Sequence, residues 1–247
     1  LALFRNSAPV SLFMVNALYR GAAVPQDFAL SFQVKLTPKN PEGFANSGVQ
    51  LRSVLQNPET WRVIGLQADI SAIPGQFGFI YDEGGPGRGA GFGEKWLITD
   101  PMPGAQEVTR KTVAQLGNRE ELLARIHHRD QWNDYRIVAR GPVMQVFVNS
   151  RQISEMELRS NVQPLGDVLA LQLHAGPPMK VEFRDFLLGP APDAAPETGQ
   201  LNAAPAWHNV ALAKAGGSAT ASDTFDPFSA SRLIDGLTAT GEGPLAQ

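Results

Sequence analysis

Three pairs of polar side chains are spaced so that they could do chemistry together. The pairs are Gln50 with Arg52, Gln67 with Asp69, and Gln172 with His174. Residues two apart in a β-strand share a face, and the residues beside these pairs are apolar. Three such strands lying side by side would form a polar surface suited to the hydroxyls of a sugar. The alternative is an ordinary solvated face of an antiparallel sheet.

The titratable members of this set suggest acid and base chemistry. His174 ends its apolar run before the rigid turn Gly176-Pro177-Pro178, and an imidazole changes charge near neutral pH. Asp69 and Glu83 could share acid and base duties, or together bind a divalent cation such as calcium. Glu83 could also be an ordinary turn residue. Arg52 offers a fork of donors to a carboxylate or sugar oxygen, or a partner for an acid across strands.

Other side chains could contact a ligand without taking part in proton transfer. Gln50, Gln67 and Gln172 could orient hydroxyls, and Tyr81 lies where a predicted strand reaches the mouth of a cleft. Trp132 could stack on a sugar, whereas Tyr135 is expected in the core. The remaining histidines are not spaced as a metal triad; they are His127, His128 and His208.

Period-2 alternation predicts that strands position these residues. From Phe28 to Leu36, apolar residues alternate with small or polar ones. Similar runs bounded by Gly, Pro, Asn and Asp occur at 47–54, 61–70, 76–82, 133–139, 143–149, 168–174 and 181–188. Many strands with few helices predict an all-β sandwich or jelly roll of antiparallel strands.

Two further segments interrupt this pattern. A short helix is predicted to begin at Asn118, which can cap it with Glu121, and to place Leu122, Leu123 and Ile126 on one face. The glycine-rich stretch from Glu83 to Asp100 lacks the Lys-Ser/Thr ending of a phosphate loop. It is interpreted as a flexible surface loop near a cleft.

Composition narrows the possible partners. The formal net charge is −3 with a pI near 5.8, and Lys and Arg are scattered, which argues against nucleic acid. The absence of cysteine excludes disulfides and thiolate metal sites. The apolar run from Val10 to Leu18 is too short to span a bilayer, so no membrane insertion is expected. A strand is favoured there, with a signal peptide as the alternative.

A change in composition after Leu188 predicts the domain organisation. Residues 1–189 are expected to form the sandwich. Residues 190–206 are rich in Pro and Ala and read as a semi-rigid linker. Residues 207–247 are too few to build a core alone.

Seven short stretches occur in order: DFAL at 27–30, NSGVQLR at 46–52, QADI at 67–70, IYDE at 80–83, WNDY at 132–135, LQLH at 171–174 and VEFRD at 181–185. Taken together, they resemble the 3-keto-disaccharide hydrolase family over roughly Asp27 to Gly189. Two positions depart from the usual pattern: Ser150 follows Asn149 where Asn-Gly is common, and Asp185 replaces a common Asn. Residues 207–247 resemble the start of a discoidin-like carbohydrate-binding domain.

The resemblance implies a concanavalin A-like sandwich acting on glycosides oxidised at C3. A base would remove the acidified C2 proton, the C1 substituent would be eliminated, and water would add to the double bond. His174, Asp69 or Glu83 would be the base, while Arg52, or a cation held by Asp69 and Glu83, would stabilise the enolate. The partner would be a glycoside or oligosaccharide, and a secreted or periplasmic bacterial location is expected. The alternative is a non-catalytic carbohydrate-binding or adhesion module.

Overall fold

Strands dominate the part of the chain that the computed structural model describes, which comprises residues 2–5, 12–15, 24–57, 62–85, 87–126, 130–160 and 166–192. The eight-stranded sheet has the order β1 (Ala2–Arg5), β14 (Met179–Gly189), β3 (Phe28–Pro38), β10 (Asn133–Arg140), β11 (Val143–Val148), β12 (Arg151–Arg159), β8 (Glu94–Thr99) and β9 (Thr109–Gln115). The six-stranded sheet has the order β2 (Leu12–Val15), β13 (Val168–Leu173), β4 (Asn46–Asn57), β5 (Arg62–Ser71), β6 (Ile80–Glu83) and β7 (Gly87–Ala90).

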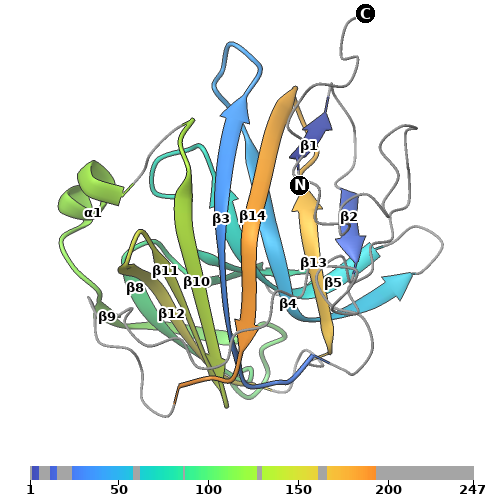
Figure 1. The fold of residues 1–247 in the computed structure, drawn as a ribbon. Helices are drawn as coiled ribbons and strands as arrows, with labels where there is room; N and C mark the ends of the chain where they lie inside the picture. The colour runs from blue at the N-terminus through green and yellow to red at the C-terminus, as the bar shows by residue number, and fades with distance from the viewer. Residues whose placement is uncertain are drawn as a thin grey trace, which may run out of the picture.

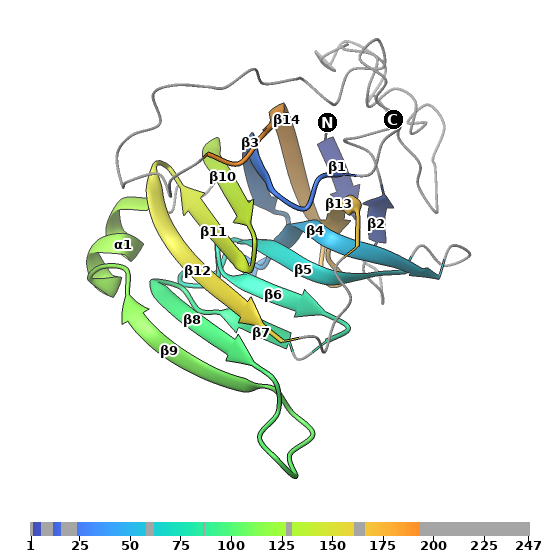
Figure 2. The same cartoon turned by 90° about the horizontal axis from the view of Figure 1, so that it is seen from below.

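The two sheets form a β-sandwich (Figure 1). Figure 2 shows the eight-stranded sheet curving from β14 through β10 and β12 to β9 around one side of the other sheet. The predicted all-β class is therefore confirmed. All neighbouring strands are antiparallel except β12 and β8, which run parallel, with Met156 beside Trp96.

The main core lies between the sheets, where alternate residues of both layers meet. Phe28, Leu30 and Phe32 of β3 are buried there, as the period-2 pattern predicts. Val49 on β4 and Leu171 on β13 belong to the same cluster. The intervening residues of β4, β5 and β13 must therefore point to the opposite face of the six-stranded sheet, away from this core.

The predicted helix exists as α1 (Arg119–Ile126), the only helix within the described ranges. The Asn118 side-chain oxygen accepts hydrogen bonds from the main-chain N–H groups of Glu120 (2.9 Å) and Glu121 (3.1 Å). These bonds satisfy two donors that a helix start leaves without intrahelical partners. Leu122 is buried and Leu123 packs on the core, so α1 covers an edge of the sandwich.

The glycine-rich stretch is not the flexible loop that the sequence suggested. It contains β7, which pairs with β6, and β8, which pairs with both β12 and β9. Glycine allows close packing here: a Cβ on Gly89 would lie 2.8 Å from the Met156 sulfur, so a larger residue would displace that side chain. Sequence patterns do not reveal such approaches, because the neighbouring side chain comes from a distant strand.

The hairpin between β11 and β12 carries one of the two departures from the family pattern. Asn149 has φ 47° and Ser150 has φ 68°, as a two-residue type I′ turn requires. Because serine is strained there, we expect Ser150→Gly to raise the free energy of unfolding by about 0.5–1 kcal/mol. Asn149→Gly should lower it, because Asn149 accepts a hydrogen bond from the Asp134 N–H and donates one to Asn133. Urea unfolding of both variants tests this, and changes of the same sign would contradict it.

Two predictions fall mainly on residues that the structure does not describe. Of the linker 190–206, only residues 190–192 are within the described ranges, and the discoidin-like segment 207–247 is outside them. Residues 127–129, which include two of the four histidines, are also outside. The N-terminal run is described at β2, where the strand interpretation is confirmed by pairing with β13.

Candidate functional site

Three neighbouring strands bring the predicted glutamines and Asp69 together. In the register of the six-stranded sheet, Gly48 of β4 lies opposite Asp69 of β5 on one side and Gln172 of β13 on the other. Gln50 lies opposite Gln67. The four polar side chains therefore share the face turned away from the main core. They are nonetheless only 0–3% exposed, so this face is not the solvated surface of the simpler interpretation.

The glutamine amides form a chain of hydrogen bonds across this face. Gln50 Nε2 donates to Gln67 Oε1 (2.9 Å), and Gln67 Nε2 donates to Gln172 Oε1 (3.2 Å). To reach Gln172 from β5, the side chain of Gln67 passes over Gly48 of the intervening strand. A Cβ on Gly48 would lie 2.4 Å from Gln67 Cδ, so only glycine leaves room for this path.

Asp69 is a buried carboxyl group at the end of this chain. Its Oδ1 accepts hydrogen bonds from Asn46 Nδ2 (3.1 Å), the Ile70 N–H (3.1 Å) and Gln67 Nε2 (3.5 Å). Burial raises the pKa of Asp69 from 3.8 to about 7; the three donors oppose the shift, and repulsion from Glu83 adds to it. Asp69 can therefore exchange a proton near neutral pH.

His174 follows β13 and is partly exposed, unlike Asp69. Its Nδ1 lies 2.5 Å from the carbonyl oxygen of Ala175. A carbonyl can only accept, so Nδ1 carries the proton and Nε2 carries the basic lone pair. The Phe44 ring packs edge-on at 5.8 Å between centroids. Neighbouring groups thus fix both the tautomer and the orientation of the ring.

Asn46 connects the histidine to the buried carboxyl group, and the sequence did not single it out. Its carbonyl accepts the His174 N–H (3.4 Å), while its side-chain Nδ2 lies 3.1 and 3.3 Å from the two oxygens of Asp69. The predicted strand began at 47, but β4 begins one residue earlier. The period of two could have indicated Asn46 as a site residue, because it lies two positions before Gly48 and therefore on the same face of β4.

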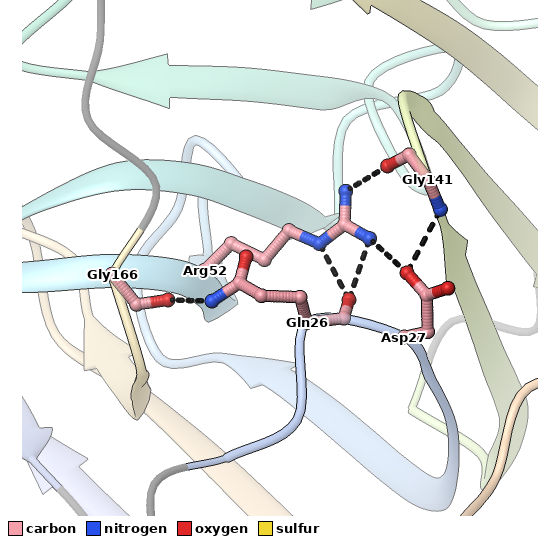
Figure 3. A network of polar contacts seen from close by, with 5 residues as sticks. All are labelled: Gln26, Asp27, Arg52, Gly141 and Gly166. Carbon is pink, nitrogen blue, oxygen red and sulfur yellow. Dashed lines mark hydrogen bonds and ion pairs between the residues drawn. The ribbon is translucent and has the colours of Figure 1, made fainter.

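Arg52 does not join the network, and its predicted pairing with Gln50 on one face is wrong. A β-bulge interrupts the register between Leu51 and Val54, and Arg52 itself has φ 47°. The side chain is therefore redirected to the other sheet (Figure 3), where its donors meet the Gln26 carbonyl, the Gly141 carbonyl (2.8 Å) and Asp27 (3.3 Å). Arg52 is 3% exposed and ties the start of β3 to the β10–β11 turn.

The other predicted contact residues divide between two sides of the molecule. Tyr81 lies opposite Gln67 and Glu83 opposite Gly65, so both belong to the face of the glutamine network. Trp132 does not. Its ring packs under Arg184 at 4.0 Å and near Lys35 at 5.3 Å, and Lys35 alternates with core residues of β3. Trp132 thus lies on the outer face of the eight-stranded sheet.

Asp82 is a second buried carboxyl group, and it faces the interior. It lies opposite core residue Leu66, is 6% exposed, and lines a small cavity with Arg88, Arg110 and Ser160. Burial raises its pKa to about 7, with Arg110 opposing the shift and Glu83 adding to it. Its backbone position opposite Leu66 explains why it is separate from the glutamine network.

The cation predicted at Asp69 and Glu83 stays a prediction. Within the described ranges, no group of three or more His, Cys, Asp or Glu side chains is arranged to hold a metal ion. Glu83 acts on Asp69 through electrostatic repulsion, which raises the pKa of Asp69.

The fold and this site define a β-sandwich whose one polar face carries a buried carboxyl group beside a histidine. The chain belongs to the family of 3-keto-alpha-glucoside-1,2-lyase-like domains, whose model matches residues 16–188. It is therefore a carbohydrate-related domain. No curated protein matches the chain in sequence.

Solved structures with similar folds are distant. A carbohydrate-binding module, CBM66, from Bacillus subtilis is 9% identical, with 76% of this chain and 91% of that chain covered and a TM-score of 0.44. Sheep galectin-11 is 11% identical, with coverage of 72% and 100% and a TM-score of 0.33. At these values the two structures bear on neither ligand nor activity. In the described part of the chain, no helix is long and apolar enough to cross a membrane.

Proposed function

We propose that this domain cleaves glycosides that carry a ketone at C3. The proposal rests on the family and on one structural observation: Asn46 links partly exposed His174 to Asp69, a carboxyl group that titrates near pH 7. A ketone acidifies the proton on the neighbouring carbon, so a correctly placed base suffices to start the reaction. A sugar is the proposed partner.

His174 is the proposed base, because it is the exposed member of the pair and its Nε2 carries the lone pair. Nε2 removes the C2 proton, and the electron pair left on C2 delocalises to the C3 oxygen as an enolate. The enolate then re-forms the ketone as a C1–C2 double bond forms and the C1–O bond breaks, and the departing oxygen takes the proton from Nε2, which regenerates the neutral imidazole. Water adds across the double bond.

Asp69 acts as a positioning residue, because its Oδ1 already accepts hydrogen bonds from Asn46, Gln67 and the Ile70 N–H. It holds the side-chain amide of Asn46, and the main-chain carbonyl of Asn46 accepts the hydrogen bond from the His174 N–H. Tyr81 and Glu83 lie on the same face and complete the proposed binding surface. Enolate stabilisation by Arg52 would require its bonds to Gln26 and Gly141 to break, so we assign Arg52 to the scaffold.

Turnover of an oxidised sugar is the direct test. The purified chain is given a 3-keto-glucoside with a chromogenic aglycone and, in parallel, the unoxidised glucoside. We expect aglycone release from the oxidised form only, and a loss of at least about 100-fold in kcat/KM for His174→Ala. In D2O, His174→Ala should also lose deuterium exchange at C2, which reports proton abstraction separately from elimination. Unchanged turnover in both His174→Ala and Asp69→Asn would contradict the site.

A non-catalytic carbohydrate-binding domain is the second candidate, and the burial of Asp69 favours it. A carboxyl group enclosed by the Asn46 and Gln67 amides is also a means of holding a binding surface rigid. Saturable binding of the 3-keto-glucoside without deuterium exchange or aglycone release would support this alternative against the enzyme.

A further inference from the structure

One oxygen of the network lacks a partner. Asn46 is only 9% exposed, and its side-chain Oδ1 is buried without a hydrogen-bond donor among the described residues. Buried amide oxygens nearly always accept a hydrogen bond, and leaving one without a donor costs free energy. Asn46 Oδ1 is therefore a buried hydrogen-bond acceptor for which the described residues supply no donor.

The direction of this acceptor is set by Asp69. Asn46 Nδ2 lies 3.1 Å from Asp69 Oδ1 and 3.3 Å from Oδ2. When Asp69 is ionised its carboxylate only accepts hydrogen bonds, so in that state the amide turns its nitrogen toward Asp69 and its oxygen away. The main chain of Asn46 is engaged as well, with its N–H 3.3 Å from the Met179 sulfur and its carbonyl bonded to the His174 N–H.

We propose that Asn46 Oδ1 accepts a hydrogen bond from the C2 hydroxyl of the bound sugar. A hydroxyl group is the donor that a sugar offers to a neutral acceptor. Asn46 adjoins His174 through the main-chain bond, so a ligand that reaches both residues meets them with neighbouring atoms. This assignment rests on the proposed function, in which His174 removes the proton from C2, the carbon that bears this hydroxyl.

A cycle of enzyme variants and deoxy sugars tests the assignment. The wild type and Asn46→Ala are compared on the 3-keto-glucoside and on its 2-deoxy, 4-deoxy and 6-deoxy analogues. We expect the 2-deoxy change to lower kcat/KM of the wild type by about 10–100-fold, but to lower that of Asn46→Ala by less than about threefold. The 4-deoxy and 6-deoxy changes should affect both proteins alike.

Ser47→Ala is the matched control. Ser47 is the next residue of β4, is fully buried, and donates its hydroxyl hydrogen to the Gln172 carbonyl (2.6 Å). Its side chain lies on the core side of the strand. Ser47→Ala should therefore lower kcat/KM for all four sugars by the same factor. This uniform decrease distinguishes a structural effect from the loss of contact with one hydroxyl. If Asn46→Ala does not fold, Asn46→Ser, whose side chain is shorter, enters the same cycle.

The outcomes separate this inference from the proposed function. If no substrate is turned over, the cycle is run on dissociation constants measured by calorimetry. If the effects of Asn46→Ala and of the 2-deoxy change on binding are not additive, while those of the 4-deoxy and 6-deoxy changes are, the Asn46 contact is upheld and the enzyme proposal fails. Additive losses for every analogue, non-additivity at C4 or C6 instead, or no binding of any of the sugars would overturn the contact even if turnover is observed.

Discussion

Replacing Arg52 with alanine is expected to lower the free energy of unfolding by about 2–4 kcal/mol. The guanidinium joins the two sheets through bonds to the Gln26 and Gly141 carbonyls, and its stem is buried. The variant loses these bonds and the packing of the stem together. Chemical denaturation followed by circular dichroism measures the change.

Two variants identify which part of the Arg52 contact matters. Asp27→Ala should cost less, because Asp27 is 55% exposed and an exposed ion pair contributes at most about 1 kcal/mol. Arg52→Lys should recover only part of the loss, since a single ammonium cannot reproduce the fork. If Arg52→Ala were as stable as the wild type yet inactive, Arg52 would belong to the chemistry after all.

The domain should become less stable as the pH rises from about 4 to about 7. The pKa of Asp69 is raised from 3.8 to about 7 in the folded protein, chiefly by burial, and that of Asp82 likewise. Between these values the folded state holds protons that the unfolded chain has lost, so folding is favoured at the lower pH. One pKa unit corresponds to about 1.4 kcal/mol, which gives at most about 4 kcal/mol for each carboxyl group.

Amide replacements should remove this pH dependence. Asp69→Asn and Asp82→Asn cannot ionise, so each should reduce the fall in unfolding free energy with pH, and the double variant should no longer lose stability between pH 5 and pH 7. Glu83→Gln should move the fall in stability to lower pH, because the charge of Glu83 raises both pKa values. Urea unfolding at pH 4, 5, 6, 7 and 8 measures the slope. A wild type with constant stability over that range would refute the prediction.

The polar face was predictable from the sequence because it depends on a local rule. Gln67 and Asp69 on β5, and Gln50 on β4, alternate with apolar residues, and the period of two holds wherever a strand is regular. Family motifs further indicated that the three strands act together. The hydrogen bonds from Gln50 through Gln67 to Gln172 then follow from the register of the sheet.

Where the prediction failed, contacts from distant parts of the chain were responsible. The bulge after Leu51 turns Arg52 to the other sheet. Trp132 immediately precedes β10, which belongs to the eight-stranded sheet. It therefore lies on the outer face of that sheet, away from the glutamine network. The glycine-rich stretch forms strands because β6 and β12 provide edges for pairing. Apart from β6, which shortly precedes β7, these partners are distant in sequence, so periodicity and composition carry no signal for them.

The sequence by itself determined an all-β domain, the set of polar residues on its strands and, through its motifs, the family. The tertiary structure decided which of those residues meet, and with what protonation. Asp69 is an ordinary carboxyl group in the sequence. It titrates near pH 7 only because folding removes it from water and brings the charge of Glu83 near it, and these effects outweigh the opposing hydrogen bonds from Asn46 and Gln67.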